Sequence, residues 1–112
     1  MSKILKVGII GVGGISNTHL PGWKASPHAE IVAGCDLRED ILPDWGKEHD
    51  VKKLTSNPSD LFNDPDIDII DVCVPNMYHA PLSIAALEAG KHVICEKPFI
   101  TNLKKTNASM LL

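Results

Sequence analysis

Short apolar runs alternate along this chain with segments whose apolar residues recur at helical spacing. The runs predict five β-strands, at residues 3–10, 30–36, 53–55, 67–74 and 92–96. The first run is almost continuously apolar at its end, as a strand covered on both faces must be, and the run at 67–74 is the strongest strand signal. The segments between these runs predict helices at about 14–26, 42–49, 57–62 and 78–88.

Proline and glycine residues lie within these predicted helices or at their ends. Pro21 and Gly22 weaken the first helical pattern and predict a bend or a break there. Pro43 suits a first helical turn, and Gly90 follows the last helix where a C-cap favours glycine. Because strands and helices alternate over short connections, we expect an α/β fold with a doubly wound, mostly parallel sheet, the Rossmann fold.

Length and composition indicate one folded domain over residues 1–112. Apolar residues make up 44% of the chain and charged residues 22%, as in ordinary globular proteins. The formal net charge is −3 and the charges are interspersed, so no basic surface offers itself to nucleic acid. No signal peptide and no membrane-spanning run is recognisable, so we expect a cytoplasmic protein without a membrane partner.

Neither the cysteines nor most of the histidines show metal-ligand spacing. Cys35, Cys73 and Cys95 lie at or near the ends of apolar runs, which predicts small core residues, with a disulfide or a zinc site as the less favoured alternative. No metal site is predicted, and surface or packing roles are expected for His19, His28, His49 and His92.

A glycine-rich turn follows the first predicted strand and opens the first predicted helix. In Gly11-Val12-Gly13-Gly14-Ile15-Ser16, Gly11 permits a tight turn and Gly13 lets the backbone approach a pyrophosphate, which the helix N-terminus attracts. Ser16 replaces the third glycine of the G-x-G-x-x-G pattern but is small enough for close packing. The turn predicts dinucleotide binding; the alternative is a tight turn without a ligand.

An acidic residue lies where such a site needs one. Asp36 stands 20 residues after Ser16, at the end of the second predicted strand, where a carboxylate accepts hydrogen bonds from the adenosine ribose. A carboxylate repels a 2'-phosphate, so NAD is favoured, although Arg38 could neutralise such a phosphate and leaves NADP open. The simpler interpretation of Arg38 is a solvated surface charge.

Two further motifs lie beyond the fourth and fifth predicted strands, at the edge where open parallel sheets bind ligands. They are Val74-Pro75-Asn76-Met77-Tyr78-His79 and Glu96-Lys97-Pro98. Together with the glycine turn and Asp36, and at matching spacing over nearly the whole chain, they resemble the glucose-fructose oxidoreductase/inositol dehydrogenase (Gfo/Idh/MocA) family of NAD(P)-dependent oxidoreductases.

The resemblance implies roles for individual residues. Those matching Asn76, Glu96 and Lys97 line the nicotinamide and its ribose, and Lys97 becomes the catalytic candidate, as a general acid or to polarise a substrate hydroxyl. The resemblance also implies a cis bond between Lys97 and Pro98. The alternative for Lys97 is a surface lysine paired with Glu96, and His79 is at least as well explained by helix capping.

The resulting predictions concern one cofactor site and an incomplete enzyme. The expected cofactor-binding residues are Gly11, Gly13, Gly14, Ile15, Ser16, Asp36, Leu37, Arg38, Val74, Pro75, Asn76, His79, Glu96, Lys97 and Pro98. Family members continue into a second, sheet-rich substrate domain, so the resemblance implies a truncated chain that binds cofactor but turns over little of a sugar- or cyclitol-type alcohol. The alternative is a stand-alone, non-catalytic NAD-binding or interaction module. The sequence leaves the substrate and a homo-oligomer open.

Overall fold

A five-stranded sheet with helices on both faces forms the molecule. The computed structural model describes residues 4–13, 16–74 and 76–95. The strands are β1 (Leu5–Ile10), β2 (Ala29–Cys35), β3 (Lys53–Thr55), β4 (Ile69–Val72) and β5 (His92–Cys95). The helices are α1 (Ser16–Ala25), α2 (Leu42–His49), α3 (Ser59–Phe62) and α4 (Asn76–Glu88), with a 3-10 turn η1 (Glu39–Ile41) before α2.

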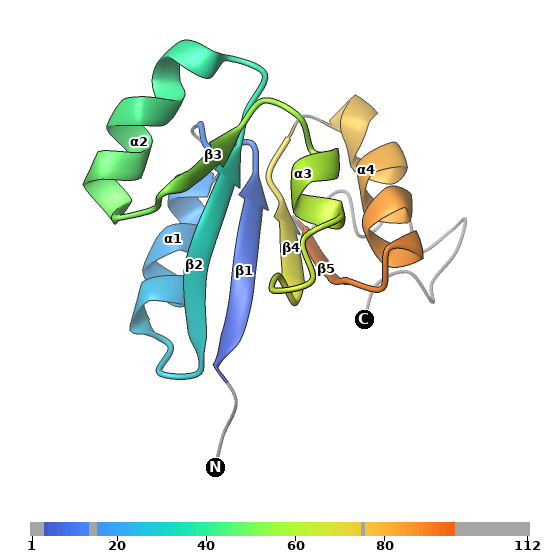
Figure 1. Cartoon of the computed structure of the whole chain (residues 1–112), viewed down its shortest axis with the longest axis horizontal. Helices are drawn as coiled ribbons and strands as arrows, with labels where there is room; N and C mark the ends of the chain where they lie inside the picture. The colour runs from blue at the N-terminus through green and yellow to red at the C-terminus, as the bar shows by residue number, and fades with distance from the viewer. Residues whose placement is uncertain (1–3, 14–15, 75, 96–112) are drawn as a thin grey trace.

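The strands lie in the order β3-β2-β1-β4-β5, and every neighbouring pair is parallel. The predicted doubly wound Rossmann fold is therefore confirmed (Figure 1). The order reverses at β1, because the chain first steps outward to β2 and β3 and then returns to β4 on the other side. Ligands bind at the carboxyl ends of the strands beside such a reversal.

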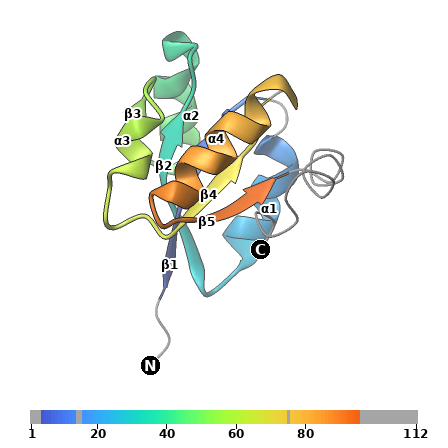
Figure 2. The same cartoon turned by 90° about the vertical axis from the view of Figure 1, so that its right-hand side faces the viewer.

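Helices cover both faces of the sheet: residues of α1 and α2 pack in one core and residues of α3 and α4 in the other. Figure 2 shows α1 and α3 on opposite sides of the strands. Successive side chains of a strand point to opposite faces, so alternate strand residues pack into the two cores. The core under α1 and α2 includes Val7, Ile9, Leu20, Leu42, Trp45 and Ile69. The core under α3 and α4 includes Ile10, Leu61, Ile70, Val72, Ala86 and Val93.

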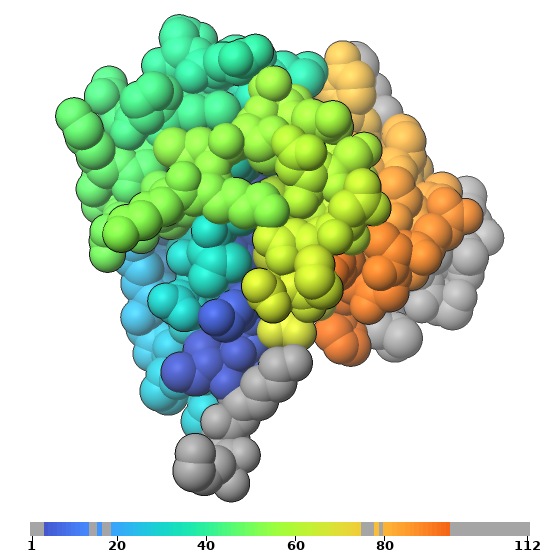
Figure 3. Space-filling model, in the orientation of Figure 1, coloured from blue at the N-terminus to red at the C-terminus, as the bar shows by residue number. Residues whose placement is uncertain are grey.

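Close packing of α2 against the sheet requires a glycine in β2. A Cβ on Gly34 in β2 would lie 2.4 Å from the ring of Trp45, so α2 can approach the sheet only where that strand lacks a side chain. On the opposite face, the segment from β3 to α3 covers much of the sheet between α2 and α4 (Figure 3).

The fourth strand is shorter than the 67–74 predicted from its apolar run. Ladder pairing spans only Ile69–Val72, although the backbone N–H groups of Asp68 and Cys73 still donate to the carbonyls of Lys6 and Ile10. Apolar character therefore continues past the strand because the flanking residues are buried too.

The helices differ from the prediction in three places. Helix α4 begins at Asn76, two residues earlier than expected, and the turn η1 was not predicted. Helix α1 continues through Pro21 as one element, so of the two alternatives, a bend or a break, the break is wrong. In the described part of the chain, no helix combines the length and the apolar character needed to cross a bilayer.

Candidate functional site

Gly11 ends β1 at the reversal of strand order. Its φ is +90°, and a Cβ there would lie 2.5 Å from the carbonyl oxygen of Cys73. Its N–H donates to the carbonyl of Cys35 over 2.7 Å. The chain can therefore turn between the ends of β2 and β4 only with glycine at this position.

The carboxylate of Asp36 joins the end of β2 to this turn. Oδ2 accepts a hydrogen bond from the backbone N–H of Val12 over 3.1 Å, and Oδ1 accepts one from the N–H of Arg38 over 2.9 Å. Asp36 is only 8% exposed. Because these two amides hold it, the carboxylate stands beside the glycine turn in a fixed orientation.

The side chain of Arg38 folds back onto the same carboxylate. Nε donates to Oδ1 over 3.1 Å and Nη2 donates to Oδ2 over 3.0 Å, although the Arg38 side chain is 61% exposed. Burial alone would raise the pKa of Asp36, but the hydrogen bonds and charge of Arg38 lower that pKa below its ordinary value. Arg38 is thus a surface charge, but one paired with Asp36.

The guanidinium also lies across the glycine turn. A Cβ on Gly13 would be 2.5 Å from Nη2 of Arg38, so the missing side chain of Gly13 leaves the space that the guanidinium fills. Ser16 closes the turn from the other side, because its buried hydroxyl donates to the carbonyl of Gly13 over 2.7 Å. The side chain of Ser16 is thus buried within the turn, at the position of the third glycine of the pattern.

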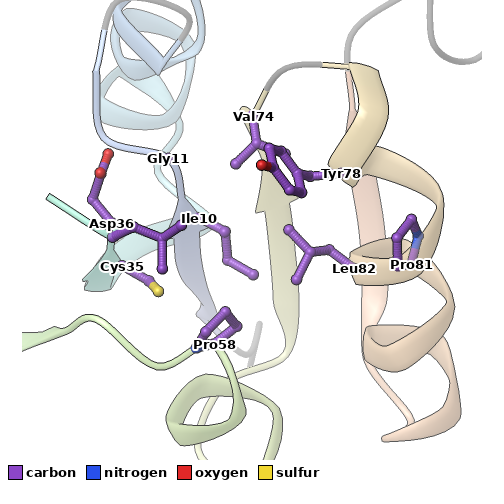
Figure 4. A pocket seen from close by; sticks show the side chains of 10 residues that line it. Ile10, Gly11, Cys35, Asp36, Pro58, Val74, Tyr78, Pro81 and Leu82 are labelled. Carbon is purple, nitrogen blue, oxygen red and sulfur yellow. The ribbon is translucent and has the colours of Figure 1, made fainter.

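An apolar pocket of about 340 Å³ opens next to Asp36, between the ends of β1 and β2 and helix α4 (Figure 4). Its lining residues are Ile10, Gly11, Cys35, Asp36, Leu37, Pro58, Val74, Tyr78, Pro81 and Leu82. Leu37 is 77% exposed and Tyr78 is also exposed, so both leave apolar surface accessible to a ligand. A planar, largely apolar ring suits this pocket, with polar groups directed toward Asp36.

The structure thus brings together Gly11, Gly13, Ser16, Asp36, Leu37, Arg38 and Val74 from the predicted set. The predicted residues outside the described part of the chain are Gly14, Ile15, Pro75, Glu96, Lys97 and Pro98, with the predicted cis bond, and the side chains of Asn76 and His79. The backbone of the latter two belongs to the first turn of α4.

Sequence reasoning missed the far wall of the pocket. Tyr78, Pro81 and Leu82 come from α4, and Pro58 comes from the loop before α3. The spacing of Tyr78, Pro81 and Leu82 at i, i+3 and i+4 was the available signal, because residues at that spacing share one helix face. Nothing in the sequence indicated that Pro58 faces them.

One polar cluster brings His19 together with residues more than 50 positions away. Donor atoms of His19, Asp71 and Cys73 lie within 4.8 Å of one another, close enough to consider a metal ion. They are, however, hydrogen-bonded among themselves: Nδ1 of His19 is 2.8 Å from each oxygen of Asp71, and Sγ of Cys73 donates to Oδ1 over 3.4 Å. These bonds account for the cluster without an ion.

The cysteines match the prediction of core residues as far as they are described. The side chains of Cys35 and Cys73 are both buried. Burial, reinforced by the negative charges of Asp36 and Asp60, raises the pKa of Cys35 to about 12. The thiol of Cys35 is therefore an uncharged part of the pocket wall at neutral pH.

Comparison with known proteins agrees with this geometry. The family described as "Oxidoreductase family, NAD-binding Rossmann fold" (GFO_IDH_MocA) matches residues 5–111. The chain belongs to this family. The family resemblance and the nicotinamide dinucleotide expected from the motifs are thereby confirmed.

Two inositol dehydrogenases and an uncharacterised oxidoreductase are among the proteins similar to this chain. Myo-inositol 2-dehydrogenase of Thermotoga maritima is 37% identical over 88% of this chain, and the uncharacterised oxidoreductase YrbE of Bacillus subtilis is 37% identical over 98% of it. The crystal structure of scyllo-inositol dehydrogenase from Lactobacillus casei, with bound NAD(H) and scyllo-inositol, superposes with a TM-score of 0.80 at 28% identity over 96% of this chain. The chain spans 30%, 32% and 34% of the lengths of these three proteins, about a third in each case.

Proposed function

We propose that this chain is the cofactor-binding domain of an oxidoreductase that transfers hydride between NAD(H) and a sugar- or cyclitol-type alcohol. One observation carries the proposal. An apolar pocket, a fixed carboxylate and a glycine turn adjoin one another at the carboxyl ends of β1 and β2. Adenine, ribose and pyrophosphate need these three environments in this order.

Each part of the site fits one part of the dinucleotide. The pocket between β1, β2 and α4 accepts the adenine, and Leu37 covers one side of the ring. Asp36 accepts hydrogen bonds from the ribose hydroxyls, and the glycine turn with the N-terminus of α1 receives the pyrophosphate. A nicotinamide bound in this way supplies the hydride acceptor or donor.

We assign the nicotinamide end to the residues after β4 and β5. The positions are Pro75, Asn76, His79, Glu96, Lys97 and Pro98, which follow the two strands in sequence. Parallel pairing of β4 with β5 supports the assignment, because it places the carboxyl ends of both strands at the same edge of the sheet. Lys97 is the catalytic candidate, and its role is to donate a proton to, or polarise, the reacting oxygen of the substrate.

The substrate class is proposed from the similar proteins. The dehydrogenases of Thermotoga maritima and Lactobacillus casei are named for myo-inositol and scyllo-inositol, which are cyclitols. A substrate needs a second wall facing the nicotinamide, and the chain spans only about a third of these proteins. We therefore expect cofactor binding from these 112 residues and hydride transfer only with that second wall.

Fluorescence titration with NADH tests the cofactor proposal. We expect saturable binding by the wild-type chain, and a loss of about tenfold or more in the variant Asp36→Asn, which keeps the side-chain volume but removes the charge. Glu39→Gln is the matched control, because it removes an exposed carboxylate three positions away. Absence of binding at about 1 mM NADH, the upper end of ordinary nicotinamide affinities, would contradict the proposal.

A further inference from the structure

Asp71 is a fully buried carboxylate in the middle of the sheet. It lies in β4, opposite Ile9 of β1, and its exposed fraction is 0%. Taking a carboxylate out of water is strongly unfavourable unless hydrogen-bond donors surround it. The residues that donate hydrogen bonds to Asp71 therefore identify the element that this carboxylate holds against the sheet.

Two donors come from one helix. Nδ1 of His19 lies 2.8 Å from both oxygens of Asp71, and Nε1 of Trp23 donates to Oδ2 over 2.7 Å. Cys73, from the same strand segment, adds a weaker contact from its thiol. We call Asp71, His19 and Trp23 the Asp71 cluster, and it ties α1 to β4.

Helix α1 is intrinsically weak in its middle and is stabilised by its hydrogen bonds to Asp71. Pro21 lies in its interior, where the ring removes a backbone N–H and crowds the preceding turn, and Gly22 adds backbone freedom directly after it. Leu20, at 4% exposure, is the one buried apolar side chain among those described in this helix. The two donors to Asp71 stand on either side of Pro21, so the carboxylate holds the helix across its weakest point.

The N-terminus of the same helix meets the glycine turn. Ser16 begins α1 and its hydroxyl donates to the carbonyl of Gly13, and His19 follows Ser16 by three residues, about one helical turn. A shift of the first turn of α1 relative to β4 would therefore move the N–H groups that a pyrophosphate meets.

We propose that Asp71 is a positioning residue for the dinucleotide: through His19 and Trp23 it fixes the N-terminal turn of α1 where the pyrophosphate binds. This inference rests on the proposed function, because it assumes that a dinucleotide occupies the site. Asp71 itself lies beneath the helix and is fully buried, so it does not contact the cofactor.

The test separates the two ends of the ligand. ADP-ribose contains the pyrophosphate, whereas adenosine occupies only the apolar pocket and reaches Asp36. We compare the dissociation constants of both ligands, by competition against NADH, for the wild-type chain, Asp71→Asn and the control Glu30→Gln, which alters an exposed residue of β2. In Asp71→Asn we expect the constant for ADP-ribose to rise about tenfold and that for adenosine to change less than about twofold.

The outcomes distinguish this inference from the proposed function. If the wild type binds neither ligand, the proposed function fails. If the wild type binds both and Asp71→Asn weakens both equally, or weakens neither, the positioning role fails, because general destabilisation does not discriminate between the ligands.

Three further variants cover the case in which Asp71→Asn does not fold. Trp23→Phe keeps an aromatic ring and removes the Nε1 donor, and His19→Leu removes the other donor, while His19→Gln retains a donor amide. The same selective loss for ADP-ribose is expected in Trp23→Phe and His19→Leu, with partial rescue in His19→Gln. Unchanged ADP-ribose binding in both Trp23→Phe and His19→Leu would overturn the proposal.

Discussion

The two oxygens of Asp36 together accept four hydrogen bonds, from the N–H groups of Val12 and Arg38 and from Nε and Nη2 of Arg38. A carboxylate has about four acceptor positions, so this one is saturated. Ribose hydroxyls can bind Asp36 only where a donor leaves. The guanidinium is the donor that can leave, because it belongs to a largely exposed side chain whereas the two amides are fixed in the backbone.

We therefore expect Arg38 to oppose NADH and to favour NADPH. Arg38→Gln should lower the dissociation constant of NADH by about threefold, because the ribose no longer displaces an ion pair. It should raise that of NADPH by about tenfold, because a 2'-phosphate loses a charge-assisted partner. Titration of both cofactors measures the two effects, with the exposed Lys47→Gln as control. Equal changes for both cofactors would contradict this role.

Burial of Cys35 gives a second prediction at the residue scale. Its raised pKa, about 12, keeps the thiol protonated and unreactive at neutral pH. Iodoacetamide at about pH 8, near the ordinary thiol pKa, should modify Cys35 in urea but leave it intact in the folded chain. Mass spectrometry of the peptide containing Cys35 checks this. Rapid modification of that peptide in the folded chain would contradict the prediction, because it would show that the reagent reaches the Cys35 thiol without unfolding.

At the scale of elements, α1 contains a proline that destabilises the helix. Pro21 is exposed within a helix of ten residues, so its side chain contributes little packing while its missing N–H costs a hydrogen bond. Pro21→Ala should stabilise the folded chain by roughly 1–3 kcal/mol. Urea denaturation measures the change, and Pro27→Ala, which alters an exposed proline outside the helix, is the control. A loss of stability in Pro21→Ala would show that the proline ring is required there.

The sequence predicted most elements because their patterns are local. The alternation of apolar runs and helical segments, Gly11 after the first strand and Asp36 after the second depend on spacing alone, and the structure has them at the expected places. The end of β4 was misplaced because burial extends beyond strand pairing. The Asp71 cluster was missed because His19 and Asp71 are 52 positions apart in sequence and meet only when α1 packs against β4.

At the scale of the whole molecule, the reversal of strand order at β1 brings the residues of the site together. Gly11 follows β1, Asp36 follows β2 and Val74 follows β4, so three separate stretches of the chain reach the same edge of the sheet. The topology could be inferred from the alternation of elements. The apolar pocket could not, because its wall from α4 depends on the angle at which that helix packs.

Because the site joins elements from both halves of the sheet, bound cofactor should stabilise the entire fold. A ligand at about 100 times its dissociation constant adds about 2.7 kcal/mol, which for a chain of this size raises the melting temperature by roughly 10 °C. Differential scanning fluorimetry with and without NADH measures the shift. Asp36→Asn should reduce it sharply at the same NADH concentration, whereas Glu39→Gln should keep it. A melting temperature that NADH leaves unmoved in the wild type would mean that the glycine turn, the carboxylate and the pocket do not act as one site.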